Sequence, residues 1–390
     1  MKHDFDSIVN RKNTNSLKWD LFNDEIPMWV ADMDFKAAPK IYEEVNKRAQ
    51  QDVYGYSIVP DEYFDSYINW WKKYGLEMKR ENLLFSISVM PAITSIIRAF
   101  TSIGDKILLQ SPVYHVFYHV IENNNREVVE NQLIYNNSTD DVDLAYTIDF
   151  EDLEKKLSDD DTKMMLLCNP HNPVGKIWKR EDLIKIADLC EKHDVILVSD
   201  EIHCDLTDPG ETYIPLASVS DYKNVFTTLS PSKTFNIAGL QNAVVFTENE
   251  EFYELLSQQL TSDFFSQSNI FAIDCAIAAY ESEDWLNELR EYLFENKKLV
   301  NSFLSENIPE IKLVPANATY LLWLDCEALN SDSNTVSTFL REKVGLFLSP
   351  GCQFGSGGDN FLRLNIACPR EILEEGLNAL KEGIRLFLEK

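Results

Sequence analysis

The stretch from Thr228 to Leu240 holds a lysine in a position that favours chemistry. Lys233 follows Ser230 and Ser232 in a turn that ends the apolar run Val225 to Leu229. Because open α/β sheets hold their ligands at the ends of their strands, a lysine here lies where a ligand crevice is expected. Its amine sits on a flexible stem and its pKa shifts readily, which suits imine formation or proton transfer. A solvated lysine in a polar turn is the alternative.

Two further stretches place polar side chains after apolar runs. Asn172 lies in Asn169-Pro-His-Asn-Pro-Val-Gly175, which is too rich in proline and glycine to be anything but a loop. Asp200 follows the apolar run Val195 to Ser199, and His203 comes three positions later. An aspartate at a strand end is more often a helix cap than a catalyst, so its role depends on its neighbours.

Arg363 is the one arginine in the apolar run Phe361 to Ala367. Most buried arginines have structural partners, but a guanidinium can also clamp a carboxylate through two parallel hydrogen bonds.

His115 and His119 have the i, i+4 spacing of a metal pair. Because no glutamate lies between them as in His-Glu-x-x-His, we predict no metal site.

The elements that must position these residues follow a strand–helix rhythm. The predicted strands are 83–88, 106–110, 163–168, 195–199, 225–229 and 243–246, and the predicted helices include 39–51, 91–100 and 181–193. This alternation predicts an α/β fold with a mostly parallel sheet covered on both faces.

The pattern changes near residue 284. A long amphipathic helix (285–306), strands 311–314 and 320–324 and a last helix (371–388) predict a smaller α+β domain. We therefore expect an N-terminal arm with part of the small domain in residues 1–38, a large domain in 39–283 and the small domain in 284–390.

Composition limits the classes of partner. At 390 residues the chain exceeds what one core usually organises, and 45% hydrophobic residues fit a soluble globular protein. A net charge of −28 repels nucleic-acid backbones and anionic membrane surfaces, so neither is expected as a partner. Seven scattered cysteines without a Cys-x-x-Cys pair, and no apolar run near the N-terminus, predict a cytoplasmic protein with reduced thiols.

The combination of Ser230-Pro-Ser-Lys233 with Asn169-Pro-His-Asn-Pro-Val-Gly175 resembles the fold-type-I enzymes that use pyridoxal 5′-phosphate (PLP). The resemblance implies PLP as cofactor and the large-plus-small domain architecture. It implies that Lys233 forms a Schiff base with PLP and that Asn172 hydrogen-bonds its O3′ atom. Asp200 then faces the pyridine nitrogen, which a buried carboxylate keeps protonated.

The phosphate of PLP needs an anion site. The junction Ser88-Val-Met-Pro-Ala92 precedes a predicted helix, so Val89 and Met90 offer free backbone N–H groups to an anion. The resemblance adds Ser230 and Ser232 to the cofactor-binding residues. Relatives usually have glycine where this chain has Ser88.

Three aromatic side chains take roles from the same resemblance. It places the ring of Tyr114 on the pyridine ring of PLP. His203 stands where many aminotransferases have a tyrosine that bonds O3′. Tyr56, with Tyr54 as the alternative, reaches across the interface of a homodimer to the phosphate in the neighbouring subunit. Many aminotransferases also have an arginine at the position of Gln241, which helps to hold the phosphate.

Two N-terminal stretches narrow the resemblance. Ser16-Leu-Lys-Trp-Asp20 and Met28-Trp-Val-Ala-Asp-Met-Asp-Phe35 are similar to the opening of the MalY/PatB group, which are cystathionine β-lyase-like C–S lyases. In that group the second stretch lines the substrate site, which implies that Ala31 contacts the substrate through its backbone. Arg363 is then the clamp for the substrate α-carboxylate, beside Asn172.

The resemblance implies α,β-elimination of L-cystathionine, L-cysteine or other cysteine S-conjugates to pyruvate, ammonia and a thiol. Lys233 would take the Cα proton as general base, with Tyr56 and Asp200 as further catalytic residues. An aminotransferase of an L-amino acid is the first alternative, because it would begin with the same proton removal. A PLP-binding regulatory protein that acts through a protein partner is the second.

Overall fold

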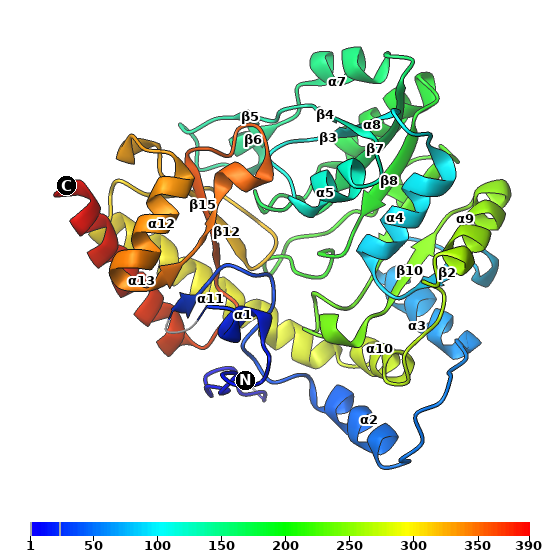
Figure 1. The fold of residues 1–390 in the computed structure, drawn as a ribbon, viewed down its shortest axis with the longest axis horizontal. Helices are drawn as coiled ribbons and strands as arrows, with labels where there is room; N and C mark the ends of the chain where they lie inside the picture. The colour runs from blue at the N-terminus through cyan, green and yellow to red at the C-terminus, as the bar shows by residue number, and fades with distance from the viewer. Residues whose placement is uncertain (1, 23–24) are drawn as a thin grey trace.

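A seven-stranded sheet forms the centre of the computed structural model, which describes residues 2–22 and 25–390. Its order is β2-β10-β9-β8-β7-β3-β4 (Figure 1). The strands are β2 (Leu83–Ser86), β3 (Lys106–Leu109), β4 (Glu127–Glu130), β7 (Thr162–Cys168), β8 (Ile196–Asp200), β9 (Val225–Leu229) and β10 (Ala243–Phe246). β10 is antiparallel to both of its neighbours, and the other pairs are parallel, which confirms the predicted mostly parallel sheet.

Helices cover both faces of this sheet. Side chains of β7 alternate between the faces, as the two-residue period of a strand requires. Met165 and Leu167 pack with α7 (Phe150–Leu157) and α8 (Arg180–Lys192). Met164 and Leu166 pack with α4 (Val89–Phe100), α5 (Val116–Glu122) and α9 (Glu250–Ser262). The other α-helices between residues 39 and 282 are α2 (Pro39–Ala49), α3 (Asp61–Trp71), α6 (Val142–Ala145) and α10 (Ala272–Tyr280).

A second, antiparallel sheet has the order β11-β12-β15-β14. Its strands are β11 (Lys312–Leu313), β12 (Leu321–Asp325), β14 (Ser349–Pro350) and β15 (Phe361–Asn365). The helices α11 (Glu283–Asn307), α12 (Ser333–Val344) and α13 (Arg370–Leu388) lie beside it, on the left in Figure 1. This matches the predicted α+β pattern, whereas the division into domains at residue 284 stays a prediction.

The N-terminal region packs against the C-terminal part of the chain. β1 (Ile26–Pro27) pairs in parallel with β13 (Leu346–Phe347), and α1 (Leu17–Asp20) precedes it. Phe5 is buried and contacts Trp285 of α11. The predicted arm of residues 1–38 includes residues 1, 23 and 24, which lie outside the described residues.

Within the described ranges, no helix has both the length and the apolar character that crossing a membrane would need. The short strands β5 (Ile134–Tyr135) and β6 (Tyr146–Thr147) form a small antiparallel pair between β4 and α7 in the chain.

Candidate active site

Three loops at the carboxyl ends of β7, β8 and β9 surround a cavity of about 130 Å³. Because these strands are parallel neighbours, their ends meet at one edge of the sheet, where open α/β sheets bind ligands. The lining residues are Ala31, Ser88, Val89, Met90, Tyr114, Cys168, Asn172, Asp200, Ile202, His203, Ser232, Lys233 and Ala238. Most of the residues predicted from the sequence are therefore brought together here.

Lys233 is poised to act as a base or nucleophile. Its Nζ atom donates a hydrogen bond of 2.7 Å to the carbonyl oxygen of Ala31. Burial and the nearby charge of Arg363 lower the pKa of the amine to about 8, against the opposing pull of Asp32 and Asp200. A substantial minority of the amine is therefore unprotonated near neutral pH, which a solvated lysine would not achieve.

Asp200 ends β8 and is buried at the cavity. Burial raises the pKa of its carboxyl to about 7, while the backbone N–H of Ile202, 3.1 Å from Oδ1, and the charge of Lys233 act in the opposite direction. An isolated buried carboxylate is costly, so this position favours a ligand that brings a positive charge to it.

The raised pKa of Asp200 predicts a dependence of stability on pH in the cofactor-free protein. The folded chain keeps this proton up to about pH 7, whereas an unfolded aspartate loses it near its ordinary pKa of 3.8. Folding therefore binds a proton between these values, and stability falls as pH rises through that window. Asp200→Asn removes the effect, so the variant should exceed the parent in stability by about 1–3 kcal/mol at pH 8 and by little at pH 4.

Denaturant unfolding of both cofactor-free proteins at pH 4, 6 and 8 measures this difference. Asp152→Asn is the matched control, since the pKa of Asp152 is lowered by hydrogen bonds from Lys156 and Asn131 that outweigh its burial. Its effect on stability should run in the opposite direction with pH. A difference between Asp200→Asn and the parent that does not change with pH would contradict the assignment.

Arg363 of β15 is a buried guanidinium whose hydrogen bonds go to neutral oxygens. It donates to Asn172 Oδ1 at 3.2 Å and to the Trp29 carbonyl at 2.8 Å, while its Nε atom has no partner among the described residues. No ion pair to a carboxylate forms at Arg363 within residues 2–22 and 25–390. Burial lowers the pKa of the guanidinium to about 10, so it stays charged at neutral pH and can receive an anion.

His203 and Asn172 provide neutral polar groups in the cavity. Burial, with the charges of Lys233 and Arg363, lowers the pKa of His203 to about 3, so its ring is uncharged at neutral pH. Its Nδ1 atom is buried without a hydrogen-bond partner in the described structure. A buried polar atom without a partner is unfavourable unless a ligand completes it.

The N-terminus of α4 also reaches the cavity, through Ser88, Val89 and Met90. The helix begins at Val89, and the Ser88 side chain makes no capping hydrogen bond. The first N–H groups of a helix have no intrahelical partners, so they can bind an anion. Ser232 faces the same cavity, and Ser230 supports it through a hydrogen bond of 2.9 Å between the two hydroxyls.

The loop that carries Ala31 is held in place by residues that the sequence did not single out. The Asn365 side-chain amide donates to the carbonyls of Val30 at 2.6 Å and Asp32 at 2.7 Å, on both sides of Ala31. Arg11 forms an ion pair of 2.7 Å with Asp32. Asn365 lies two positions after Arg363, in the run Phe361 to Ala367 of which only the arginine was predicted as a site residue, whereas Arg11 lies in no recognisable motif.

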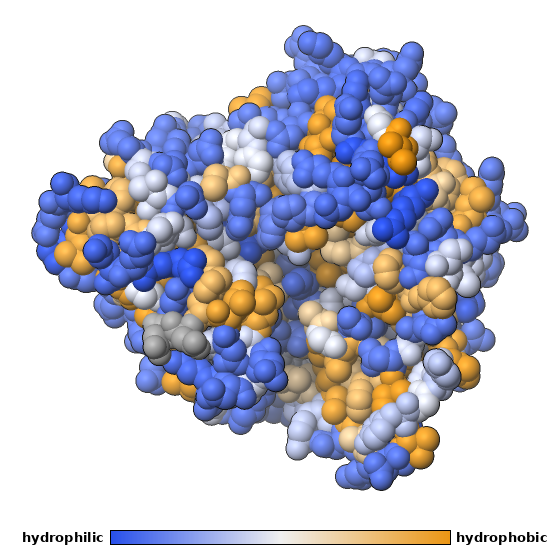
Figure 2. Space-filling model, viewed as in Figure 1, coloured by the Kyte–Doolittle hydropathy of each residue, from blue (hydrophilic) through white to orange (hydrophobic). Residues whose placement is uncertain are grey.

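Tyr56 is not part of the cavity of its own chain. It is fully exposed, at 100%, and its neighbours Val53, Tyr54 and Ile58 are also exposed. Figure 2 shows apolar side chains on the lower right of this face, over α2 and α10. An exposed run of large apolar side chains is typical of a protein–protein contact.

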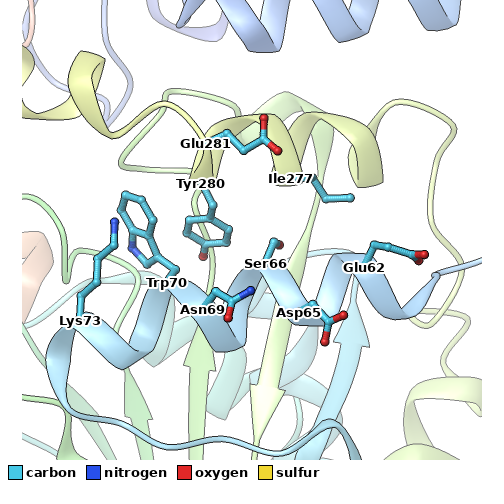
Figure 3. Close-up of a pocket in the computed structure, with 9 residues that line it drawn as sticks. All are labelled: Glu62, Asp65, Ser66, Asn69, Trp70, Lys73, Ile277, Tyr280 and Glu281. Carbon is cyan, nitrogen blue, oxygen red and sulfur yellow. The ribbon is translucent and has the colours of Figure 1, made fainter.

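A larger hollow of about 480 Å³ lies between α3 and α10, away from the predicted site residues (Figure 3). Trp70 and Tyr280 lie along it, and the Lys73 ammonium sits 3.8 Å from the centre of the Trp70 ring. Lys73 is also paired with Glu283 at 2.7 Å. The described residues contain no group of three or more His, Cys, Asp or Glu side chains that could hold a metal ion.

Comparison with known proteins places this geometry in context. The family described as aminotransferase class I and II matches residues 27–380. The chain is 39% identical to cystathionine beta-lyase PatB of Bacillus subtilis (strain 168), covering 97% of this chain and 99% of PatB. It is 34% identical to protein MalY of Escherichia coli (strain K12), covering 98% and 99%. The crystal structure of cystalysin from Treponema denticola, which contains a pyridoxal 5′-phosphate cofactor, has a TM-score of 0.92 and 33% identity, covering 99% of each chain.

Proposed function

We infer the function from the premise that this chain belongs to the aminotransferase class I and II family. The resemblance to the MalY/PatB group is confirmed, because PatB and MalY are similar to nearly the whole chain. We propose that the chain is a PLP-dependent carbon–sulfur β-lyase. The observation that carries this proposal is one cavity lined by the amine of Lys233 and the buried carboxyl of Asp200. The buried guanidinium of Arg363 donates to Asn172 of the same lining and has no carboxylate partner among the described residues.

The residues of the cavity fit PLP. Asp200 is a buried carboxyl that favours a protonated ring nitrogen, and His203 has a ring nitrogen, Nδ1, without a partner among the described residues. Asn172 adds an amide that can bond an oxygen on the ring, and Tyr114 adds an aromatic face. The phosphate would be held by the first N–H groups of α4 and by Ser232. Lys233 supplies the amine through which such a cofactor is attached.

Bound PLP supplies an electron sink for the bond to Cα of an amino acid. The side chains of the site bind the substrate and move its proton. Arg363 binds the α-carboxylate and so fixes the substrate in one orientation. Lys233 removes the proton from Cα, and the electron pair of that bond forms a Cα–Cβ double bond as the Cβ–S bond breaks. Sulfur leaves with the Cβ–S electron pair as a thiolate, which takes up a proton to give the thiol. Water then releases the remaining three-carbon unit as pyruvate and ammonia.

The test is release of pyruvate and free thiol from L-cystathionine by the purified PLP-loaded protein, with no 2-oxo acid present. Sustained turnover, with one thiol for each pyruvate, supports the lyase. A single turnover that resumes only when a 2-oxo acid is added would instead identify an aminotransferase and overturn the proposal.

A homodimer with shared active sites is part of this proposal. Tyr56 is fully exposed on its own chain and does not line its cavity. We propose that it completes the phosphate site of a second copy. A cytoplasmic location is also proposed, supported by the absence of any disulfide among the seven cysteines, all of which the structure describes.

Mixing two inactive variants tests the shared site. Lys233→Ala and Tyr56→Ala dimers are each expected to have low activity. If Tyr56 serves the other subunit, a mixed dimer has one site with both defects and one intact site. When the two variants are unfolded and refolded together, about half of the dimers that form at random are mixed, and each mixed dimer has one intact site of two. Activity should therefore recover toward about one quarter of the parent value. Refolding each variant alone is the control. No recovery in mixed dimers separated by affinity tags would contradict the shared site.

A further inference from the structure

The carbonyl oxygen of Ala31 accepts two hydrogen bonds inside the cavity region. One comes from Lys233 Nζ at 2.7 Å, and the other from the Tyr320 hydroxyl at 3.2 Å. A carbonyl oxygen has two lone pairs, so these two donors fill its capacity. Tyr320 is fully buried, and its ring lies 6.4 Å from that of His203.

Both partners of the Tyr320 hydrogen bond are held by the fold. Tyr320 directly precedes β12, and the backbone N–H of Thr319 beside it donates to the Leu206 carbonyl at 2.6 Å. Ala31 is held on both sides by the Asn365 amide. Contacts that do not involve Lys233 therefore hold both Tyr320 and the loop that carries Ala31.

We propose that Tyr320 is a positioning residue for Lys233. By donating to the same carbonyl, its hydroxyl fixes the place where the free amine rests and weakens the hydrogen bond that would hold the amine as an ammonium ion. An oxygen that already accepts one hydrogen bond has less charge to offer a second donor. Tyr320 thus favours the neutral form of Lys233, which is the form that accepts a proton.

Charges of both signs face Lys233. Asp32 and Asp200 favour the ammonium form, whereas burial and the charge of Arg363 favour the amine. His203 is neutral because its pKa is lowered, and Tyr320 is neutral because burial raises the pKa of its phenol far above the usual value. The inference rests on the proposed role of Lys233 as the base, but not on the reaction that follows.

Tyr320→Phe tests the proposal in the full-length protein freed of cofactor. Trace labelling with acetic anhydride across pH 6 to 10, read by mass spectrometry of the peptide that contains Lys233, gives the midpoint at which this amine becomes reactive. In Tyr320→Phe the midpoint should rise by about 0.5–1 pH unit, which lowers the neutral amine near pH 7 roughly three- to tenfold. The other lysines in the same sample serve as internal references.

Tyr135→Phe is the matched control, because it removes a partly buried tyrosine hydroxyl that lies outside the cavity and donates a hydrogen bond of 2.9 Å to Asp325. It should leave the Lys233 midpoint unchanged. If Tyr320→Phe does not fold, 3-fluorotyrosine at position 320 keeps the packing and donates more strongly, so the midpoint should fall. The proposal is overturned if the Lys233 midpoint is unchanged or lower in folded Tyr320→Phe. It is also overturned if the Lys233 midpoint is unchanged or higher in the protein with 3-fluorotyrosine at position 320. Because no substrate is used, the answer does not depend on whether the chain is a lyase or an aminotransferase.

Discussion

Lys233→Ala is expected to lower kcat/KM for thiol release from L-cystathionine by about 10²- to 10⁴-fold, the range that a positioned general base contributes. The structure gives the reason, since Lys233 is the only amine among the residues that line the described cavity. Neither titratable neighbour replaces it. Asp200 is proposed to face the ring nitrogen of the cofactor, and His203, whose pKa burial lowers to about 3, is too weak a base to hold the proton. Steady-state pyruvate release measures the loss.

Lys233→Arg is the informative companion variant. It keeps a positive charge of similar reach but holds its proton in proteins, so it cannot act as a base. It should therefore be as inactive as Lys233→Ala. Circular dichroism of both variants should match the parent, because Lys233 makes one side-chain hydrogen bond, to Ala31. Lyase activity of Lys233→Arg within tenfold of the parent would exclude Lys233 as the base.

The sequence could predict the strands whose ends carry the site residues, because turn residues flank the apolar runs of these strands. Val225–Leu229 and Ala243–Phe246 were predicted to the residue, since Ser-Pro-Ser follows the first and Glu-Asn-Glu lies just beyond the second. Helix α10 was missed because eight of its nine residues are of apolar or small types and it is buried almost all round, so it has no polar face to give a helical period. The edge strand β4 was missed because its sequence, Glu-Val-Val-Glu, is short and charged at both ends.

The same reasoning explains which site residues could be found. Asp200 ends a strand, and Asn172 and Lys233 each lie shortly after one. Adjacent parallel strands must end at one edge of the sheet, so the meeting of these residues follows from the order of the elements. The meeting of Ala31 with Tyr320 has no such local cause, because 289 positions separate them and only tertiary packing brings them together. Tertiary contacts of this kind leave no pattern in a single sequence.

Arg363→Gln is expected to lower kcat/KM for L-cystathionine by about 10²- to 10³-fold, mostly through KM. Loss of a buried, charge-assisted clamp costs about 2–5 kcal/mol, which spans this range. The change should depend on the substrate carboxylate. A thioether amine that lacks the α-carboxylate should be turned over slowly by the parent and at nearly the same rate by Arg363→Gln. If the variant loses as much activity toward the amine as toward the amino acid, Arg363 does not bind the carboxylate.

The same substitution should make the ligand-free protein more stable, which separates a clamp from a structural arginine. A guanidinium that holds the fold together loses a carboxylate partner when it is replaced, and the protein weakens. Arg363 instead bonds neutral oxygens of Asn172 and Trp29, and its burial disfavours its own charge. Arg341 is the matched control, because its guanidinium pairs with Glu25 at 2.9 Å. In urea unfolding of the cofactor-free protein, Arg363→Gln should therefore be more stable than the parent, whereas Arg341→Gln should be less stable. A loss of stability in Arg363→Gln would show that the charge of Arg363 stabilises the fold and does not serve a ligand.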